Sequence, residues 1–312
     1  MKHRILQCAP LSPSLDAALE QLFDVHQLWQ ESDPATFIAQ QGALFEGVAT
    51  SAPVGVSGEM IAALPNLRVI ASRGIGLDKI DLENARRRGI QVGNTPGVLT
   101  DCVADLAFGL LIDVARQMTA ADRFVREGKW LHDKYPLTSR VSGKRLGIVG
   151  FGQIGRAMAK RAGGFSMEVR YFNRTPVPDV DLVQESSLEA LARWADFLMV
   201  SIAGGVETRH LISASVLAAL GPEGFLINIA RGTVVDQGAL VQALSSGAIA
   251  GAGLDVYENE PVVPEVLLNC DSVVLLPHVA SGTVDTRAAM EQIVLGNLEA
   301  FFATGKVIFP AI

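Results

Sequence analysis

Residues 144–175 read KRLGIVGFGQIGRAMAKRAGGFSMEVRYFNRT and carry the strongest structural signal in the chain. A short apolar run, 146–149, precedes three glycines at G-x-G-x-x-G spacing, and a second apolar run follows at 169–172. Between the glycines and the second run, apolar side chains recur at helical intervals: Ile154, Met158, Ala159 and Ala162. A strand, a glycine turn, a helix and a strand in this order predict the βαβ unit that binds a dinucleotide.

The three glycines have different expected roles. Gly150 permits the tight turn out of the strand, Gly152 lets the backbone approach a pyrophosphate, and Gly155 lets the helix pack close to the sheet. Gln153 and Ile154 begin the helix, where free N–H groups and the positive end of the helix dipole favour phosphate. We therefore predict that these five residues bind the pyrophosphate of a dinucleotide.

The residues after the second strand indicate which cofactor is bound. NAD-binding units place Asp or Glu about twenty residues beyond the first glycine, where the carboxylate bonds the ribose 2′-OH. Asn173, Arg174 and Thr175 occupy that place here. A guanidinium group suits a 2′-phosphate, although a solvated surface arginine is the alternative. The sequence predicts NADP(H), with weaker use of NAD(H).

Composition and charge narrow the class of protein. The 312 residues are enough for two domains, and 49% of them are apolar, so disorder is not expected. The net charge of −7 and the lack of a long basic segment argue against nucleic acid and anionic membranes as partners. The run Arg86-Arg87-Arg88 before Gly89 is interpreted as the last turn of a helix with a glycine cap.

The cysteines and the apolar runs bear on the cellular compartment. Cys8, Cys102 and Cys270 are odd in number and far apart, so neither a disulfide framework nor a metal site is predicted. The apolar run near the N-terminus is too short for a signal peptide. The segment 106–115 contains Asp113 and is interpreted as a buried helix rather than a membrane span. We expect a cytoplasmic protein.

Strand and helix patterns alternate along the chain, which predicts parallel sheets covered by helices. In the first part, strands are predicted at 3–9, 24–28, 44–49, 67–71 and 90–93. In the second part, beyond the glycine motif, they are predicted at 197–202, 225–230, 250–255 and 273–276. Long helices are predicted at 103–126 and 284–304, and a Ser186…Glu189 capping box predicts the start of a shorter one.

Three polar residues follow strands in the second part of the chain. Arg231 follows FLINIA, Glu260 follows AGLDVYEN and His278 follows VVLLP. Each alone also fits an ordinary role, as a surface charge, a turn residue or a hydrogen-bonded core histidine. Because the carboxyl ends of parallel strands meet at one edge of a sheet, together they predict a site beside the glycine motif.

Several motifs resemble those of the D-isomer-specific 2-hydroxyacid dehydrogenases. The resemblance extends over nearly the whole chain, through IGLDKIDL, NTPGVLTDCVADLAFGLL, GKRLGIVGFGQIGRAMAKR, INIARGTVVDQGAL, AGAGLDVYENEP and LLPHVASGT. The C-terminal third, and Asn-Arg-Thr at 173–175, are most similar to the NADPH-using branch of glyoxylate/hydroxypyruvate reductases and hydroxyphenylpyruvate reductases. The resemblance implies reduction of a 2-keto acid to a D-2-hydroxy acid.

The resemblance also implies a role for each polar residue. His278 would donate a proton to the carbonyl oxygen, and Glu260 would orient the ring and favour its charged form. Arg231 would bind the keto acid and polarise its carbonyl. The backbone of Ile75 and Gly76, in a glycine-dense loop at 72–81, would bind the substrate carboxylate, although a plain turn is the local alternative. Formate dehydrogenases carry Gln in place of this glutamate, so keto acid reduction is favoured.

Further residues are placed by the resemblance. Asp255 would bond the nicotinamide carboxamide, and other expected cofactor contacts are Ile202, Ala203, Thr208, Ile229, Ala230 and Ser281. Residues 203–208 depart from the family's usual Leu-Pro-like segment. Arg73 stands where relatives often have a small residue, and a solvated loop arginine is favoured over a contact with a second anionic group of the substrate. Trp130 either reaches the partner subunit's active site or packs in a core or interface.

We therefore expect an α/β protein with two Rossmann-like or flavodoxin-like domains and an active site in the cleft between them. Residues 1–97 with 284–312 would bind the substrate, and residues 98–283 the dinucleotide. The helix and arm at 103–135 resemble the family's dimer contact, which implies a homodimer. Glyoxylate and hydroxypyruvate are the leading substrates and hydroxyphenylpyruvate is the alternative. A non-catalytic NAD(P)-binding sensor or corepressor is the alternative from another class.

Overall fold

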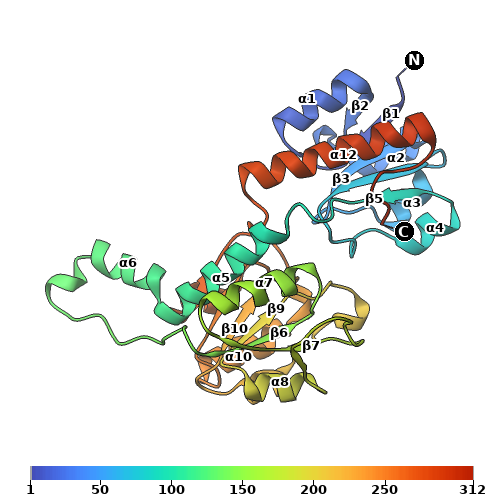
Figure 1. The fold of residues 1–312 in the computed structure, drawn as a ribbon. Helices are drawn as coiled ribbons and strands as arrows, with labels where there is room; N and C mark the ends of the chain where they lie inside the picture. The colour runs from blue at the N-terminus through green and yellow to red at the C-terminus, as the bar shows by residue number, and fades with distance from the viewer. Residues whose placement is uncertain (1, 312) are drawn as a thin grey trace. The chain divides into compact units, whose positions relative to one another are not determined.

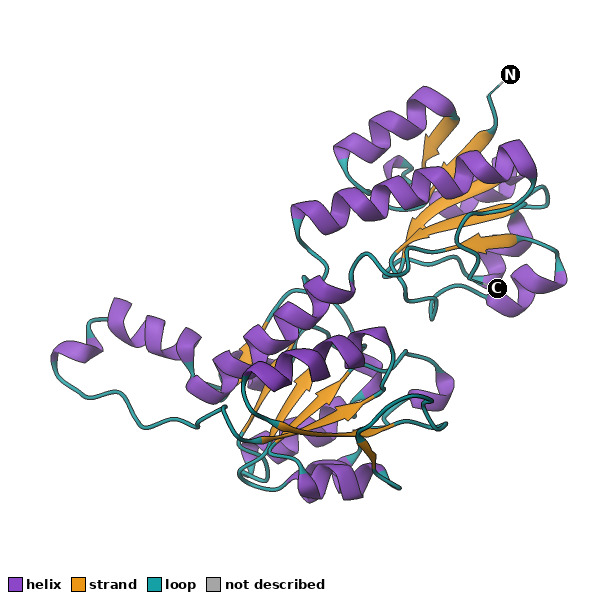
Figure 2. Ribbon diagram, in the orientation of Figure 1, coloured by secondary structure: helices purple, strands orange, loops and turns teal. Residues whose placement is uncertain are grey.

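The computed structural model describes residues 2–311, which divide into two compact units. Unit 1 comprises Met1–Leu99 with Thr283–Ile312, and unit 2 comprises Thr100–Gly282. Each unit is built on a parallel sheet with helices packed on it (Figure 2). The α/β class and the two Rossmann-like domains expected from the sequence are confirmed.

The sheet of unit 1 has five strands in the order β2-β1-β3-β4-β5, and every neighbouring pair is parallel. The strands are β1 (Arg4–Gln7), β2 (Asp24–Gln27), β3 (Gly47–Ser51), β4 (Val69–Arg73) and β5 (Gln91–Gly93). This is the flavodoxin-like order, in which the winding direction changes between β1 and β3.

Different helices cover the two faces of this sheet, because successive strand residues point to opposite faces. Leu6 lies in the core cluster on one face, and its neighbour Ile5 lies in the cluster on the other. The first face is covered by α2 (Pro34–Gln41), α3 (Gly58–Ala63) and α4 (Leu82–Arg87), and the second by α1 (Pro13–Leu22) and α12 (Val284–Thr304). Figure 1 shows α12 returning from the end of the chain to lie beside α1.

The sheet of unit 2 has seven strands in the order β12-β11-β10-β9-β6-β7-β8, again all parallel. The strands are β6 (Arg145–Val149), β7 (Glu168–Phe172), β8 (Val183–Gln184), β9 (Phe197–Val200), β10 (Phe225–Asn228), β11 (Gly251–Leu254) and β12 (Val273–Leu275). Six of them have the dinucleotide-binding order, and β12 extends it by one strand. The winding direction changes between β6 and β9, and ligands of open α/β sheets bind at the carboxyl ends of the strands at such a point.

Two helices, α5 (Thr100–Arg116) and α7 (Gln153–Gly164), pack together on this sheet, and α8 (Leu188–Trp194), α9 (Ala214–Leu220) and α10 (Gln237–Ser245) form a second apolar cluster with it. The short α11 (Glu265–Leu268) precedes β12. The helix α6 (Met118–Arg126) extends away from the sheet of its own unit (Figure 1). Within residues 2–311, no helix combines the length and the apolar character that a membrane crossing requires.

The prediction of one long helix over 103–126 is wrong in one respect, because this segment forms two helices. Gln117 separates α5 from α6 and has a left-handed backbone, with φ of 50°. Asp113 accepts a hydrogen bond from the Thr119 backbone N–H at 2.8 Å, and this bond satisfies a donor at the start of α6. A left-handed residue other than glycine leaves no signal in the apolar periodicity.

Other predicted boundaries also needed correction. The strand expected to start at residue 44 starts at Gly47, because residues 42–44 form a short 3-10 helix. The helix expected to start at Ser186 is capped by Ser187, whose Oγ accepts a hydrogen bond from Ala190 N–H at 3.1 Å. The short elements β8 and α11 were not predicted, since each has only a few residues and no periodicity.

The basic run at 86–88 ends a helix, as predicted. Arg87 is the last residue of α4, and Gly89 follows with a left-handed φ of 66°. The Arg88 guanidinium donates hydrogen bonds to carbonyl oxygens at the end of α3, among them Leu64 O at 2.8 Å. The run therefore stabilises the carbonyl ends of helices, where cations are favoured.

Candidate active site

The site residues that the sequence predicts in unit 2 follow the carboxyl ends of the strands, with the exception of Trp130. The glycine turn follows β6, residues 173–175 follow β7, residues 202–208 follow β9, and Arg231 follows β10. The remaining residues follow β11 and β12: Asp255, Glu260, His278 and Ser281. Because all seven strands are parallel, these loops lie at one edge of the sheet.

The glycine turn has the geometry that a bound pyrophosphate requires. Gly150 has a left-handed φ of 90°, and a Cβ there would lie 2.9 Å from the Ile202 Cα. A Cβ on Gly155 would lie 2.4 Å from the Gly150 carbonyl oxygen, so α7 packs directly on the turn. A Cβ on Gly152 would meet nothing within 4 Å, and the residue lies at the N-cap of α7. The turn therefore offers open space beside a helix N-terminus, which fits a dinucleotide phosphate.

Replacing Gly155 with Ala is expected to destabilise unit 2 by about 1–3 kcal/mol and to weaken dinucleotide binding, because the new methyl group overpacks the turn. Thermal unfolding and a fluorescence titration with NADPH measure the two effects. Gly163→Ala is the matched control, since Gly163 also lies in α7 and a Cβ there meets nothing within 4 Å. Equal behaviour of the two variants would show that the close packing at Gly155 has no consequence.

The loop after β7 is ordered by its own polar groups. The Asn173 side chain donates a hydrogen bond to Thr175 O at 2.9 Å, and the Gln184 side chain donates one to Asn173 O at 2.9 Å. Arg174 forms an ion pair with Glu207, and the two side chains are 76% and 77% exposed. The guanidinium is thus accessible at the carboxyl edge, but it already has a carboxylate partner.

His278 and Glu260 form a hydrogen-bonded pair, with His278 Nδ1 2.8 Å from Glu260 Oε2. The other carboxylate oxygen accepts a hydrogen bond from Tyr257 N–H at 3.1 Å. Burial alone would raise the pKa of the Glu260 carboxyl, but the bond and charge of His278, Tyr257 N–H and the charge of Arg231 hold this pKa below its ordinary value. Since Nδ1 faces the carboxylate, Nε2 is the ring atom that can deliver a proton.

Asp255 anchors the turn that carries His278. The histidine has a left-handed backbone, with φ of 54°, which is uncommon for a residue other than glycine. The fully buried Asp255 carboxylate accepts hydrogen bonds from Val279 N–H at 2.8 Å and Ala280 N–H at 2.9 Å. Burial raises the pKa of the Asp255 carboxyl, although both N–H donors oppose this effect. The sequence predicted a cofactor contact for Asp255 but not this anchoring role.

Tyr257 is a second anchor that the sequence analysis missed. Its phenol donates a hydrogen bond to Leu276 O at 2.9 Å, two residues before His278, while its backbone N–H binds Glu260. Burial raises the pKa of the Tyr257 phenol to about 12, so the group stays a donor. The tyrosine within the apolar run AGAGLDVY was the only signal for this role, since a buried phenol needs a partner.

Arg231 lies close to the hydrogen-bonded pair of His278 and Glu260. Its Nη1 donates a hydrogen bond to Ala230 O at 2.7 Å, and Asn228 Nδ2 donates one to Arg231 O at 3.0 Å. A Cβ on Gly232 would lie 1.8 Å from the Tyr257 carbonyl carbon, so the loop after β10 touches the segment that precedes Glu260. The structure therefore places a guanidinium, a carboxylate and an imidazole at the same edge of one sheet.

Ile75 and Gly76 lie in unit 1, in the loop after β4. The Thr95 hydroxyl accepts a hydrogen bond from Gly74 N–H at 3.0 Å, and Thr95 N–H donates one to Gly74 O at 3.1 Å. The Asn94 side chain is 3.4 Å from Ile75 O, and Ile75 is 41% exposed. These bonds hold the loop at the carboxyl edge of its sheet.

Residues 108–280 match the family model of the NAD binding domain of D-isomer specific 2-hydroxyacid dehydrogenases. The chain belongs to this family. It is 43% identical over 308 residues to glyoxylate/hydroxypyruvate reductase A of Arabidopsis thaliana and to hydroxyphenylpyruvate reductase of Plectranthus scutellarioides, covering 99% of this chain and 98% of each relative. The solved structure of an NADPH-dependent glyoxylate/hydroxypyruvate reductase from Sinorhizobium meliloti, in complex with NADP and malonate, has a TM-score of 0.92 at 39% identity, over 100% of this chain and 97% of that chain.

The family resemblance predicted from the motifs is thus confirmed, and a nicotinamide cofactor is supported. In this 2-hydroxyacid dehydrogenase, the expectation for Arg73 was wrong. The guanidinium is not a solvated group, because it donates a hydrogen bond to Leu11 O at 2.6 Å and its Nε is shielded from solvent. Burial lowers the pKa of Arg73, and the charge of Arg287 acts in the same direction. The arginine joins the end of β4 to the loop after β1.

Trp130 of this dehydrogenase lies in a 3-10 helix, Lys129–Leu131, and is 69% exposed. Packing in the core of its own chain, one of the expected alternatives, is therefore excluded.

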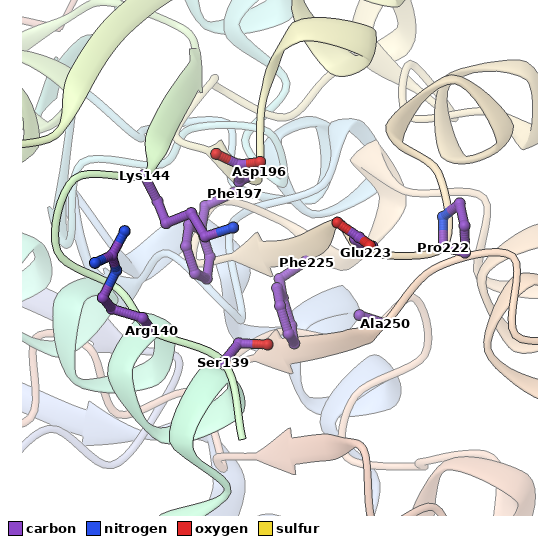
Figure 3. Close-up of a pocket in the computed structure, with 9 residues that line it drawn as sticks. All are labelled: Ser139, Arg140, Lys144, Asp196, Phe197, Pro222, Glu223, Phe225 and Ala250. Carbon is purple, nitrogen blue, oxygen red and sulfur yellow. The ribbon is translucent and has the colours of Figure 1, made fainter. Parts of the chain in front are cut away.

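A pocket of about 350 Å³ lies at the opposite edge of the same sheet, where strands β6, β9, β10 and β11 begin (Figure 3). Lys144, Asp196 and Glu223 are among its lining residues. The Asp196 carboxylate already accepts hydrogen bonds from Arg145 N–H at 2.8 Å and from Arg145 Nη2 at 2.9 Å. None of the predicted site residues lines this pocket, so it is separate from the carboxyl edge.

Proposed function

We propose that this chain reduces small 2-keto acids, glyoxylate and hydroxypyruvate, to D-2-hydroxy acids with NADPH. The observation that carries the proposal is the 2.8 Å hydrogen bond between His278 and Glu260, at the sheet edge that also holds the glycine turn. Keto acid reduction needs both a hydride and a proton. The reduced nicotinamide supplies the hydride when bound, and a carboxylate-oriented histidine supplies the proton.

His278 is proposed to donate the proton from Nε2 to the carbonyl oxygen. Its Nδ1 is bonded to the Glu260 carboxylate, which fixes the orientation of the ring. Tyr257 and Asp255 hold the backbone of the pair in place. The Arg231 guanidinium is proposed to bind the substrate carboxylate and carbonyl oxygen, and thereby to polarise the carbonyl. The N–H groups of the loop at 75–76 are proposed to bind the same carboxylate.

Initial rates with four acids test the substrate: glyoxylate, hydroxypyruvate, phenylpyruvate and 4-hydroxyphenylpyruvate. Fast oxidation of NADPH with the two small acids is expected. Faster turnover of the aromatic acids would leave the proposed mechanism unchanged but would identify an aromatic keto acid as the substrate. Such an acid is the second candidate because of the similarity to the hydroxyphenylpyruvate reductase of Plectranthus scutellarioides. Tight NADPH binding with no turnover of any acid would favour the sensor or corepressor instead.

Arg174→Ala is expected to raise the KM for NADPH about 10- to 100-fold and to leave the KM for NADH nearly unchanged. A hydrogen bond to a charged group contributes about 1.5–3 kcal/mol, and only NADPH carries the 2′-phosphate. Steady-state kinetics with both cofactors on wild type and variant measure the effect. A wild-type kcat/KM higher with NADH than with NADPH would contradict the proposed cofactor.

We also propose a cytoplasmic homodimer that forms through α6 and the arm after it. Apolar side chains are exposed along this segment of the described chain: Met118, Val125, Trp130, Leu131 and Leu137. An exposed apolar patch of this kind is typical of a protein–protein contact. Light scattering should give twice the chain mass of 33.2 kDa, and a monomer mass would contradict the proposal.

A further inference from the structure

The ion pair between Arg174 and Glu207 has an unusual position in the sheet of unit 2. In the strand order, β6 lies between β7 and β9 (Figure 1). Arg174 follows β7, and Glu207 lies in the 3-10 helix Val206–Thr208 after β9. Neighbouring strands are about 4.8 Å apart, so the two loops arise about 10 Å apart on opposite sides of β6. Their side chains therefore meet across the carboxyl end of β6, where the glycine turn begins.

The two loops are each held by bonds of their own, so the pair links two ordered segments. The Thr208 hydroxyl donates a hydrogen bond to Ala203 O at 2.8 Å in the loop after β9. Asn173 and Gln184 bond the backbone of the loop after β7. Neither set of bonds depends on the ion pair. The long side chains of Arg174 and Glu207 can therefore separate without unfolding either loop.

The pair is also weak enough to be displaced. Both side chains are more than three-quarters exposed, at 76% and 77%. Exposed ion pairs contribute only about 0.2–1 kcal/mol. A dianionic phosphate offers the same guanidinium more charge and more acceptor oxygens than a carboxylate does.

We propose that Glu207 is a specificity-determining residue, which competes with the 2′-phosphate of NADPH for Arg174. The inference rests on the proposed NADPH-dependent reductase and extends it. NADPH must separate Arg174 from Glu207, whereas NADH, which lacks the 2′-phosphate, leaves the pair intact. Selectivity is a difference between two affinities, so a competitor that acts on one cofactor alone lowers it. Glu207 thus makes the chain less selective for NADPH than Arg174 alone would.

Binding titrations without substrate test this inference. We would measure the Kd of NADPH and NADH, and of adenosine 2′,5′-bisphosphate and AMP, for the wild type and for Glu207→Gln. The variant should bind NADPH and the bisphosphate about two- to fivefold more tightly, while NADH and AMP change little. Unchanged NADPH affinity, or an equal gain for both cofactors, would overturn the proposal.

Two further variants separate competition from a general loss of negative charge. In the Arg174→Ala background, Glu207→Gln should bring no gain, because the guanidinium for which they compete is absent. A gain of the same size in that background would mean simple repulsion of phosphate by Glu207 and would overturn the proposal. Asp181→Asn is the matched control, since Asp181 lies in the same loop as Arg174 and makes no ion pair within residues 2–311. It should leave the NADPH to NADH ratio at the wild-type value.

The titrations also distinguish failure of this inference from failure of the proposed function. The titrations do not require turnover. If the chain reduces no keto acid but Glu207→Gln changes NADPH affinity as expected, the proposed function is wrong and the role of Glu207 is supported. If the chain reduces keto acids with NADPH but its cofactor affinities do not change in Glu207→Gln, the proposed function is supported and the inference about Glu207 is wrong.

Discussion

His278→Asn is expected to lower kcat for 2-keto acid reduction by about 10²- to 10⁴-fold, which is the usual contribution of a general acid. The amide side chain cannot deliver a proton to the carbonyl oxygen. Asparagine is suited to this position because it tolerates the left-handed backbone that residue 278 adopts, with φ of 54°. Asp255 still holds the N–H groups of the next two residues, so the turn should persist.

Stopped-flow or steady-state rates with saturating glyoxylate and NADPH measure the effect, and a fluorescence titration checks that NADPH still binds.

His210→Asn is a closely matched control. His210 also has a left-handed backbone, with φ of 52°, and also pairs with a glutamate, with its Nε2 2.9 Å from Glu258 Oε1. No proton transfer is proposed for it, so kcat should stay within a few-fold of wild type. Wild-type turnover in His278→Asn would remove His278 from the proton-donor role. An equal loss in both variants would show that the effect is structural.

Features with a local signal could be predicted from the sequence. The turn at Gly150 and the close approach at Gly155 depend on residues a few positions apart. That Glu260 and His278 lie at one sheet edge was also anticipated, because each follows a strand, while their hydrogen bond was implied by the family resemblance. Parallel strands bring such loops to one edge whatever the strand order is, so that prediction needed no topology.

Features that depend on strand order or on burial could not be predicted. The ion pair of Arg174 with Glu207 joins loops 33 residues apart across an intervening strand, and the sequence does not show which strands are neighbours. Arg73 looked like a loop residue, because nothing near it in sequence shows that Leu11 O lies within reach. The boundary between α5 and α6 at Gln117 could not be predicted, because the apolar periodicity continues across it. Contacts between segments distant in sequence decided the cases of Arg174 and Arg73, whereas a left-handed residue caused the break at Gln117.

Arg231→Ala is expected to lower kcat/KM for 2-keto acids by about 10³-fold and to leave NADPH affinity nearly unchanged. The guanidinium is the group proposed to bond both the substrate carboxylate and the carbonyl oxygen, and loss of one such electrostatic donor costs about 10²–10³ in rate. Loss of the carboxylate contact raises KM in addition. Arg231→Lys keeps the charge without the planar fork, so it should recover only part of the activity.

A structural effect of Arg231→Ala must be excluded, because this side chain donates a hydrogen bond to Ala230 O and its charge helps to hold the pKa of the Glu260 carboxyl low. The pH dependence of kcat/KM and the thermal midpoint should therefore be measured for both variants. Arg209→Ala is the control, since Arg209 also pairs with a glutamate of the same segment, with its Nη2 2.7 Å from Glu258 Oε1. Its activity should stay near wild type. If Arg231→Ala kept more than about a tenth of the wild-type kcat/KM, well above the range expected for a lost electrostatic donor, the substrate-binding role would have to be given to another cation.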